Sequence, residues 1–149
     1  HILLFRDKPR EGAADRASFK NFSFNFDSAA GIIYTVDVTK PSGQKVTVLS
    51  MADGTPFDMN KMYTVALNSY RGNGGGELLT KGAGIPQDEL KGRIISSTDK
   101  DLRYYLMQYI EQTKVIEPRA LGQWKFIPEE WAAPASKRDY EFLFGKVQE

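Results

Sequence analysis

The residues best suited to chemistry lie in a polar, glycine-rich stretch that follows an apolar run. Tyr70 supplies an aromatic ring, Arg71 a guanidinium group, and Asn68 and Asn73 supply side-chain amides. The glycines that follow, Gly74-Gly75-Gly76, let the backbone adopt positive φ and approach another group closely, because no Cβ blocks it. Such a corner is suited to a flat ligand such as a nucleobase, which would stack on the tyrosine and bond to the amides.

The same residues also have a structural interpretation. Tyr70 would then cap the hydrophobic core, and Asn68 and Asn73 would bond their own backbone, as asparagines in turns often do. Arg71 would either bind a phosphate or stabilise the turn, and the glycines would serve only to turn the chain. The residue types alone leave these alternatives open.

Other chemistries find little support in the sequence. The only histidine is His1, there is no cysteine, and no HExxH, EF-hand or carboxylate-rich pattern occurs, so a catalytic triad or a metal centre is not predicted within this chain. A phosphate-binding loop of the Walker type is excluded because Gly76 is followed by Glu77 rather than lysine. The sequence therefore predicts no catalytic residue, no metal ligand and no cofactor in this chain itself.

Three stretches resemble a known family. Asn68-Ser69-Tyr70-Arg71, with the glycines after it, resembles the signature of the C-terminal domain of 5′-nucleotidases. Asn25-Phe26-Asp27 leading into residues 31–38, and Ser97 to Tyr105, resemble the same family, especially the periplasmic 2′,3′-cyclic-nucleotide 2′-phosphodiesterase/3′-nucleotidases. The matches lie in order over roughly Phe22 to Ile110.

The resemblance implies a two-part enzyme. An N-terminal metallophosphatase domain of the same protein, with two divalent ions, would hydrolyse the phosphoester, and the present domain would bind the nucleotide. Tyr70 would stack on one face of the base, with Asn68, Arg71 and Asn73 near it. Gly74 and Gly75 would let the backbone come close to the ring. The family also implies a periplasmic or cell-envelope location.

One position departs from the family pattern. Near Gly76, related 5′-nucleotidases often have an aspartate that contacts the nucleoside. The hydrogen bonds that the family makes to the nucleoside are therefore not carried over to this chain in detail.

Length and composition set broader limits. The 149 residues suit one ordinary domain, and 41% hydrophobic with 26% charged residues is typical of a soluble globular protein. With 20 basic and 19 acidic residues, no strong field favours nucleic acid or an anionic membrane. No apolar stretch approaches the ~20 residues that span a bilayer. The start at His1, without a signal-peptide layout, predicts a piece of a longer protein that lacks the first strand and helix of its domain.

Two other classes of function remain open at this point. One is a non-catalytic module that binds carbohydrate or single-stranded nucleic acid through Tyr70 and the phenylalanines. The other is a structural domain without a ligand, in which the glycine-rich corner is only a turn.

The hydrophobic periodicity predicts a single α+β domain, a mixed β-sheet packed with helices. After a loop over residues 7–20, we expect strands over residues 21–26, 32–38, 45–49, 63–68 and 123–127. Turns are expected at residues 41–43 and 53–56, short helical turns at 77–81 and 86–90, and a last helix over 134–144.

The clearest predicted helix begins at Thr98 as N-cap and ends before Pro118. An apolar stripe at helical spacing supports it: Leu102, Tyr105, Leu106, Tyr109 and Ile110.

Overall fold

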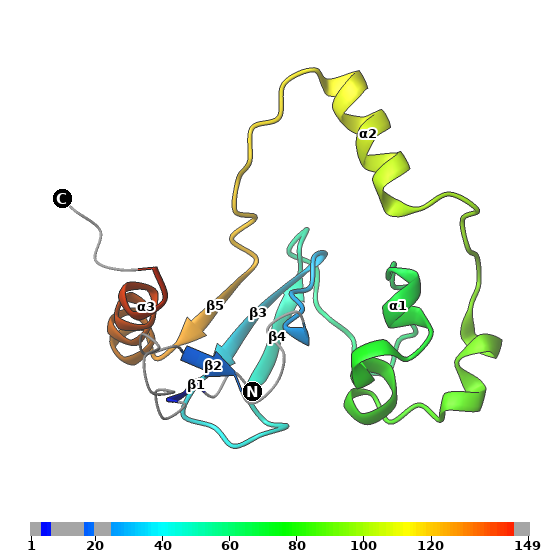
Figure 1. The fold of residues 1–149 in the computed structure, drawn as a ribbon. Coiled ribbons are helices and arrows are strands. Elements are labelled where there is room, and N and C mark those ends of the chain that lie inside the picture. The colour runs from blue at the N-terminus through cyan, green and yellow to red at the C-terminus, as the bar shows by residue number, and fades with distance from the viewer. Residues whose placement is uncertain (1–3, 7–16, 20–24, 145–149) are drawn as a thin grey trace, which may run out of the picture. The chain divides into compact units, whose positions relative to one another are not determined.

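The computed structural model describes residues 4–6, 17–19 and 25–144 (Figure 1). By their internal contacts, these residues fall into two compact units. The first is made of His1–Asn60 together with Leu121–Glu149, and the second of Lys61–Ala120.

The first unit is built on a mixed three-stranded sheet in the order β4-β3-β5. The central strand β3 (Ile32–Asp37) pairs antiparallel with β4 (Val46–Met51) and parallel with β5 (Trp124–Ile127). These three strands confirm the predictions at residues 32–38, 45–49 and 123–127. With the helices, they confirm the α+β class and the mixed sheet. A second, two-stranded sheet joins β1 (Leu4–Arg6) to β2 (Ala17–Phe19). Strand β2 lies within residues 7–20, which the sequence predicts to form a loop.

Local turn chemistry explains the β3–β4 hairpin. Gly43 adopts φ +81°, which is strained for other residues, and the Gln44 N–H donates to the Pro41 carbonyl at 3.2 Å. At the start of this connection the Asp37 carboxylate accepts hydrogen bonds from both the N–H and the hydroxyl of Thr39, at 2.9 and 2.6 Å. These short-range contacts are why the hairpin is readable in the sequence.

An aromatic cluster forms the core of this unit. The parallel register places Tyr34 beside Trp124, and their rings stack with centroids 6.0 Å apart and an interplanar angle of 12°. Phe26 and Phe126 also contact Trp124, at 5.8 and 5.1 Å between centroids. Tyr34 is buried, and its hydroxyl accepts a hydrogen bond from the Ala29 N–H at 3.1 Å. The cluster thus joins β3, β5 and the segment before β3.

The predicted strand over residues 21–26 can be compared only at its end. Residues 20–24, with Phe22 and Phe24, lie outside the described residues, and Asn25 and Phe26 are not in a strand. Phe26 instead contacts Trp124 while remaining partly exposed.

Helix α3 (Glu129–Phe144) lies next to β5 (Figure 1). The prediction that it begins at Pro134 is wrong. The Pro128 carbonyl accepts from the N–H groups of Trp131 and Ala132, so the first turn forms directly after β5, with Glu129 and Glu130 favourably placed at the helix N-terminus. Pro134 lies inside the helix rather than at its first turn.

The second unit is a series of short helical turns followed by a longer helix. Its elements are α1 (Ser69–Gly72), η2 (Gly75–Glu77), η3 (Leu78–Gly82), η4 (Gln87–Glu89), η5 (Lys91–Arg93) and α2 (Leu102–Thr113). The short turns predicted near residues 77–81 and 86–90 are confirmed, as η3 and η4.

The strand predicted over residues 63–68 is wrong. These residues form no strand, and Val65 and Leu67 are 68% and 43% exposed. Alternating apolar residues give the propensity for a strand, but a strand also needs a hydrogen-bonded neighbour. No segment among the described residues pairs with this one.

Helix α2 forms where its apolar spacing predicts, but its cap is Asp101 and not Thr98. The Asp101 carboxylate accepts from the Tyr104 N–H at 3.0 Å, whereas the Thr98 hydroxyl donates to the Lys100 carbonyl at 3.1 Å. The helix ends at Thr113, followed by Lys114 at φ +64°, well before Pro118. All five residues of the predicted apolar stripe are exposed in the structure.

Candidate functional site

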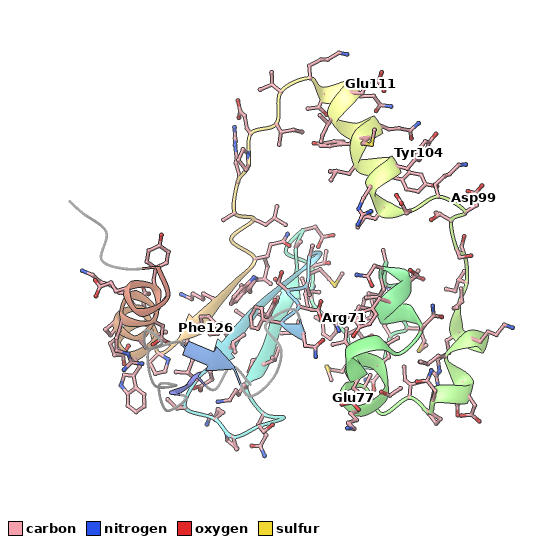
Figure 2. The ribbon with its side chains drawn as sticks, in the orientation of Figure 1. Arg71, Glu77, Asp99, Tyr104, Glu111 and Phe126 are labelled. Atoms are coloured by element: carbon pink, nitrogen blue, oxygen red, sulfur yellow. The ribbon has the colours of Figure 1, made fainter. Side chains whose placement is uncertain are left out.

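The predicted site residues gather in one compact segment, residues 68–77, called here the glycine corner. It comprises α1, its N-cap and the turn that follows (Figure 2). Asn68 begins it: its side-chain oxygen accepts a hydrogen bond from the Arg71 N–H at 2.8 Å and so caps α1. This is the backbone bond that the structural interpretation of Asn68 predicts.

Arg71 lies inside the corner. Its side chain is buried, with the residue only 4% exposed, and its Nη1 donates to the Gly75 carbonyl at 3.1 Å. Its guanidinium carbon lies over the Tyr70 ring, 5.3 Å from the centroid, which is within cation–π distance. The guanidinium therefore links α1 to the glycine turn.

Tyr70 is not sealed inside a hydrophobic core. It is 53% exposed, and the edge of its ring lies against Gly75. A Cβ on Gly75 would sit 2.5 Å from Tyr70 Cε2 and 2.6 Å from Cδ2, so only glycine fits this contact. The ring thus touches the corner on one side and leaves about half of the residue's surface accessible.

Asn73 and Gly74 form the other side of the corner. The Asn73 carbonyl accepts a hydrogen bond from Gln87 Nε2 at 3.1 Å. Gly74 adopts φ +92°, and a Cβ there would meet Gln87 Oε1 at 2.5 Å and the buried Leu90 at 3.1 Å. Gln87 therefore closes this turn from η4.

Sequence reasoning did not find Gln87 or Leu90. Both are separated from the glycines by more than ten residues, and a glutamine or a leucine in a short helical turn has no local pattern that marks such a contact. The prediction of a turn at residues 86–90 was the only available signal.

The corner ends in two consecutive residues whose backbone is in the left-handed conformation. Gly76 has φ +69° and Glu77 has φ +61°, a conformation that is uncommon for a residue with a side chain. The Glu77 carboxylate pairs with Lys81 at 2.6 Å, and both side chains are well exposed. In this exposed position the ion pair contributes little to stability.

A hollow of about 320 Å³ lies elsewhere in the second unit, at the end of α2. Its lining residues are Tyr109, Thr113, Val115, Ile116, Glu117 and Arg119. None of the predicted site residues lines it.

The described residues offer little to a metal ion or a bilayer. Among residues 4–6, 17–19 and 25–144, no group of three or more His, Cys, Asp or Glu side chains is placed to hold a metal. No helix in this part of the chain combines the length and apolar character needed to cross a membrane.

All six predicted site residues are therefore neighbours in the structure. Tyr70, Arg71 and Gly75 contact one another, Asn68 bonds to the backbone of Arg71, and Asn73 and Gly74 are joined through Gln87. Their contact with a ligand stays a prediction.

Comparison with known proteins identifies the segment. Residues 9–81 match the family described as 5′-nucleotidase, C-terminal domain, and this stretch includes the whole glycine corner. The chain carries a 5′-nucleotidase C-terminal domain. This confirms the family resemblance drawn from the residues.

A curated relative agrees with the family match. The chain is 30% identical over 133 residues to the trifunctional nucleotide phosphoesterase protein YfkN of Bacillus subtilis (strain 168). The match covers 80% of this chain and only 8% of that protein, so the chain spans a small part of the relative's length. No solved structure gave a significant match.

Proposed function

We propose that this 5′-nucleotidase C-terminal domain is the substrate-specificity domain of a secreted nucleotidase or 2′,3′-cyclic-nucleotide phosphodiesterase. In this proposal the domain binds the nucleoside part of a nucleotide, with Tyr70 stacked on the base. The family match and the relative's name, a nucleotide phosphoesterase, support the reaction class. The observation that carries the binding role is that Tyr70, a half-exposed residue, lies on a braced, glycine-rich corner.

The geometry suits stacking. A base needs an accessible ring face, and Tyr70 is 53% exposed although its ring edge contacts Gly75. Gly75, which has no Cβ, lets the backbone lie directly against the ring edge, while Gly74 packs against Gln87 and Leu90. Base–aromatic stacking of this kind contributes about 1–3 kcal/mol per base.

Only some polar groups of the corner remain available to bind a ligand. The Asn68 oxygen is used by the cap, so its NH₂ group is the part available to a ligand. The Asn73 side chain is exposed and accepts or donates no hydrogen bond within the described residues. Asn73 is therefore the better candidate to read the polar edge of a base.

Catalysis in this proposal comes from another part of the protein. The described residues lack a group of acidic or histidine side chains that would fit a metal, so we place the two divalent ions in a separate N-terminal metallophosphatase domain of the same protein. The ions would activate the attacking water there. The contribution of the present domain is orientation, which holds the phosphoester where it can react.

The location is likewise proposed from the family. A periplasmic or cell-envelope enzyme would meet extracellular nucleotides as its substrates. Nucleic acid is not expected as a partner, since the formal net charge of +1 provides no field for a polyanion.

The first prediction concerns Tyr70 in the full-length enzyme. Tyr70→Ala should raise KM for a nucleotide about 5- to 150-fold, which corresponds to the loss of 1–3 kcal/mol of stacking. KM for a small aryl phosphate without a base should stay the same, and Tyr70→Phe should keep most of the nucleotide affinity. Tyr140→Ala is the matched control, because Tyr140 is 51% exposed but lies on α3.

Two results would contradict the proposal. Equal effects of Tyr70→Ala on the nucleotide and the aryl phosphate would exclude base stacking. No effect on either substrate, together with no change in the NMR signals of the corner on titration with adenosine, would favour a structural domain without a ligand.

A further inference from the structure

The Tyr70 ring is held on two sides by its own corner. On one face lies the Arg71 guanidinium carbon, 5.3 Å from the ring centroid. At the ring edge lies Gly75, so close that a Cβ would overlap Cε2 and Cδ2. Figure 2 shows Arg71 on α1, with Glu77 on the turn that follows.

The same two residues are bonded to each other. Arg71 Nη1 donates to the Gly75 carbonyl at 3.1 Å, which fixes the guanidinium relative to the glycine turn. Asn68 holds the Arg71 backbone from the other end through its cap bond at 2.8 Å. The ring therefore lies in a small frame built from residues 68–75.

Burial separates two roles for Arg71. A phosphate-binding arginine must present free N–H groups to the ligand, since Arg binds phosphate through its donor fork. Arg71 is only 4% exposed and uses one donor on a backbone carbonyl. Its position fits a brace behind the aromatic ring better than a ligand for the phosphate.

We propose that Arg71 and Gly75 are positioning residues that fix the Tyr70 ring in the orientation needed for base stacking. This inference rests on the proposed function. It changes the role of Arg71 from a possible phosphate contact to a residue that acts through Tyr70. The frame lowers the conformational entropy that the ring loses when a base binds, because its rotamer is already restricted.

The entropy cost of fixing a free side chain sets the expected rise in nucleotide KM. Immobilising one free side chain on binding costs enough to weaken affinity about two- to tenfold. Arg71→Met removes the charge and the donor but keeps a long apolar side chain, so it should raise nucleotide KM by about this factor. KM for the aryl phosphate, and kcat for both substrates, should not change. Arg71→Lys should restore part of the nucleotide affinity, because an ammonium group can still lie over the ring.

Gly75→Ala tests the other side of the frame. Its Cβ would overlap both the ring edge and the Tyr70 carbonyl oxygen, which lies 2.5 Å from the Cβ position, so Tyr70 should shift. The nucleotide KM should again rise while the aryl phosphate KM stays the same. Arg93→Met is the control for removing an arginine from the same unit, since Arg93 pairs with Glu89 at 2.8 Å away from the corner.

A double-mutant cycle provides the deciding measurement. If Arg71 and Gly75 act through the ring, neither Arg71→Met nor Gly75→Ala should raise nucleotide KM further in a Tyr70→Ala background. Additive effects would overturn the inference, and so would a rise in aryl phosphate KM with Arg71→Met, which would identify Arg71 as a phosphate ligand. Should Arg71→Met fail to fold, Arg71→Lys and Gly75→Ala carry the same cycle.

The cycle also separates this inference from the proposed function. An unchanged nucleotide KM in Tyr70→Ala would contradict base stacking itself. A large effect of Tyr70→Ala, combined with additive or absent effects at Arg71 and Gly75, would leave stacking intact and overturn only the positioning role.

Discussion

Asn68 illustrates how one residue can carry a structural and a functional prediction at the same time. Its side-chain oxygen caps α1 by accepting from the Arg71 N–H, yet its amide nitrogen lies at the start of the segment that presents Tyr70. Aspartate at this position would keep the accepting oxygen and remove the donor. The two roles are therefore separable by substitution.

We expect Asn68→Ala to destabilise the glycine corner by about 1 kcal/mol, because the Arg71 N–H loses its partner. Asn68→Asp should retain the stability, as aspartate is an equally good N-cap. Denaturant unfolding measures the first effect, and nucleotide KM measures any contact with the base. A rise in KM with Asn68→Asp at unchanged stability would show a direct contact, whereas an unchanged KM would restrict Asn68 to the cap.

The sequence predicts the residues of the corner better than their contacts. The spacing of Tyr70, the asparagines and the glycines marks a turn because these residue types have strong local preferences. The bond from Arg71 to the Gly75 carbonyl and the bond from Gln87 to the Asn73 carbonyl are not predictable in this way. These bonds depend on which backbone carbonyls lack a partner within the folded turn. A local sequence pattern does not predict this.

Helix α2 shows the corresponding limit for a whole element. Its apolar spacing correctly predicts a helix, but both Thr98 and Asp101 are acceptable N-caps by residue type. The structure selects Asp101, whose carboxylate accepts from the Tyr104 N–H. Boundaries of this kind are set by one hydrogen bond, and the sequence offers two candidates for it.

Substitution of the cap distinguishes the two. Asp101→Ala should cost about 1 kcal/mol of helix stability, and Thr98→Ala should cost much less because the Thr98 hydroxyl bonds only to the Lys100 carbonyl. Hydrogen exchange of the first-turn amides, Tyr104 above all, measures the difference. Faster exchange in Thr98→Ala than in Asp101→Ala would return the cap to Thr98.

Two aspartates in the turns that flank β4 should make the folding stability of the sheet unit depend on pH. Asp37 accepts two hydrogen bonds from Thr39, and Asp53 accepts two from Thr55. The side-chain bond from the threonine hydroxyl is the largest cause that lowers the pKa of each carboxyl below its ordinary value of 3.8. Because the pKa is lower in the folded state, each group stabilises the fold above pH 3.8, and this stabilisation is lost as the pH falls through the lowered pKa.

The urea midpoint should therefore fall as the pH decreases below about 4. A double variant with Asp37→Asn and Asp53→Asn should show a smaller fall, since neither amide takes up a proton in this range. Tryptophan fluorescence follows the unfolding of this unit, because Trp124 lies on β5 and Trp131 on α3. Asp88→Asn on η4 serves as the control outside the hairpin. An equally steep fall in the double variant would assign the acid sensitivity to other carboxyl groups.

The elements that the sequence predicts well are those formed by neighbours in the chain. The β3–β4 hairpin follows from its turn residues, and the partner of each strand is the next segment along the chain. The periodicity predicts a strand over residues 123–127, which forms as β5, but it does not predict the parallel pairing with β3, because that pairing joins residues about ninety positions apart. The same reason explains the error at residues 63–68, where the periodicity is correct for a strand but no partner lies among the described residues.

For the whole molecule, family and geometry support different parts of the conclusion. The match over residues 9–81 and the 30% identity to a nucleotide phosphoesterase give the class of protein, while the chain spans only 8% of that relative. The corner around Tyr70 gives a candidate for nucleoside binding, and the described residues contain no metal-binding group of three acidic or histidine side chains. That binding and hydrolysis are separate tasks of two domains of one enzyme stays a proposal.

This separation predicts a specific response to chelation of the full-length enzyme. EDTA should abolish hydrolysis of both the nucleotide and the aryl phosphate, because both reactions would use the proposed pair of divalent ions. Adenosine binding, followed by calorimetry, should keep nearly the same Kd, because stacking on Tyr70 and bonds from the corner require no metal. Tyr70→Ala should give the reverse pattern, with adenosine affinity reduced and aryl phosphate hydrolysis retained. A loss of adenosine binding in EDTA, restored by adding Mn²⁺ or Zn²⁺, would place the metal in the nucleoside site and contradict the division of tasks between the two domains.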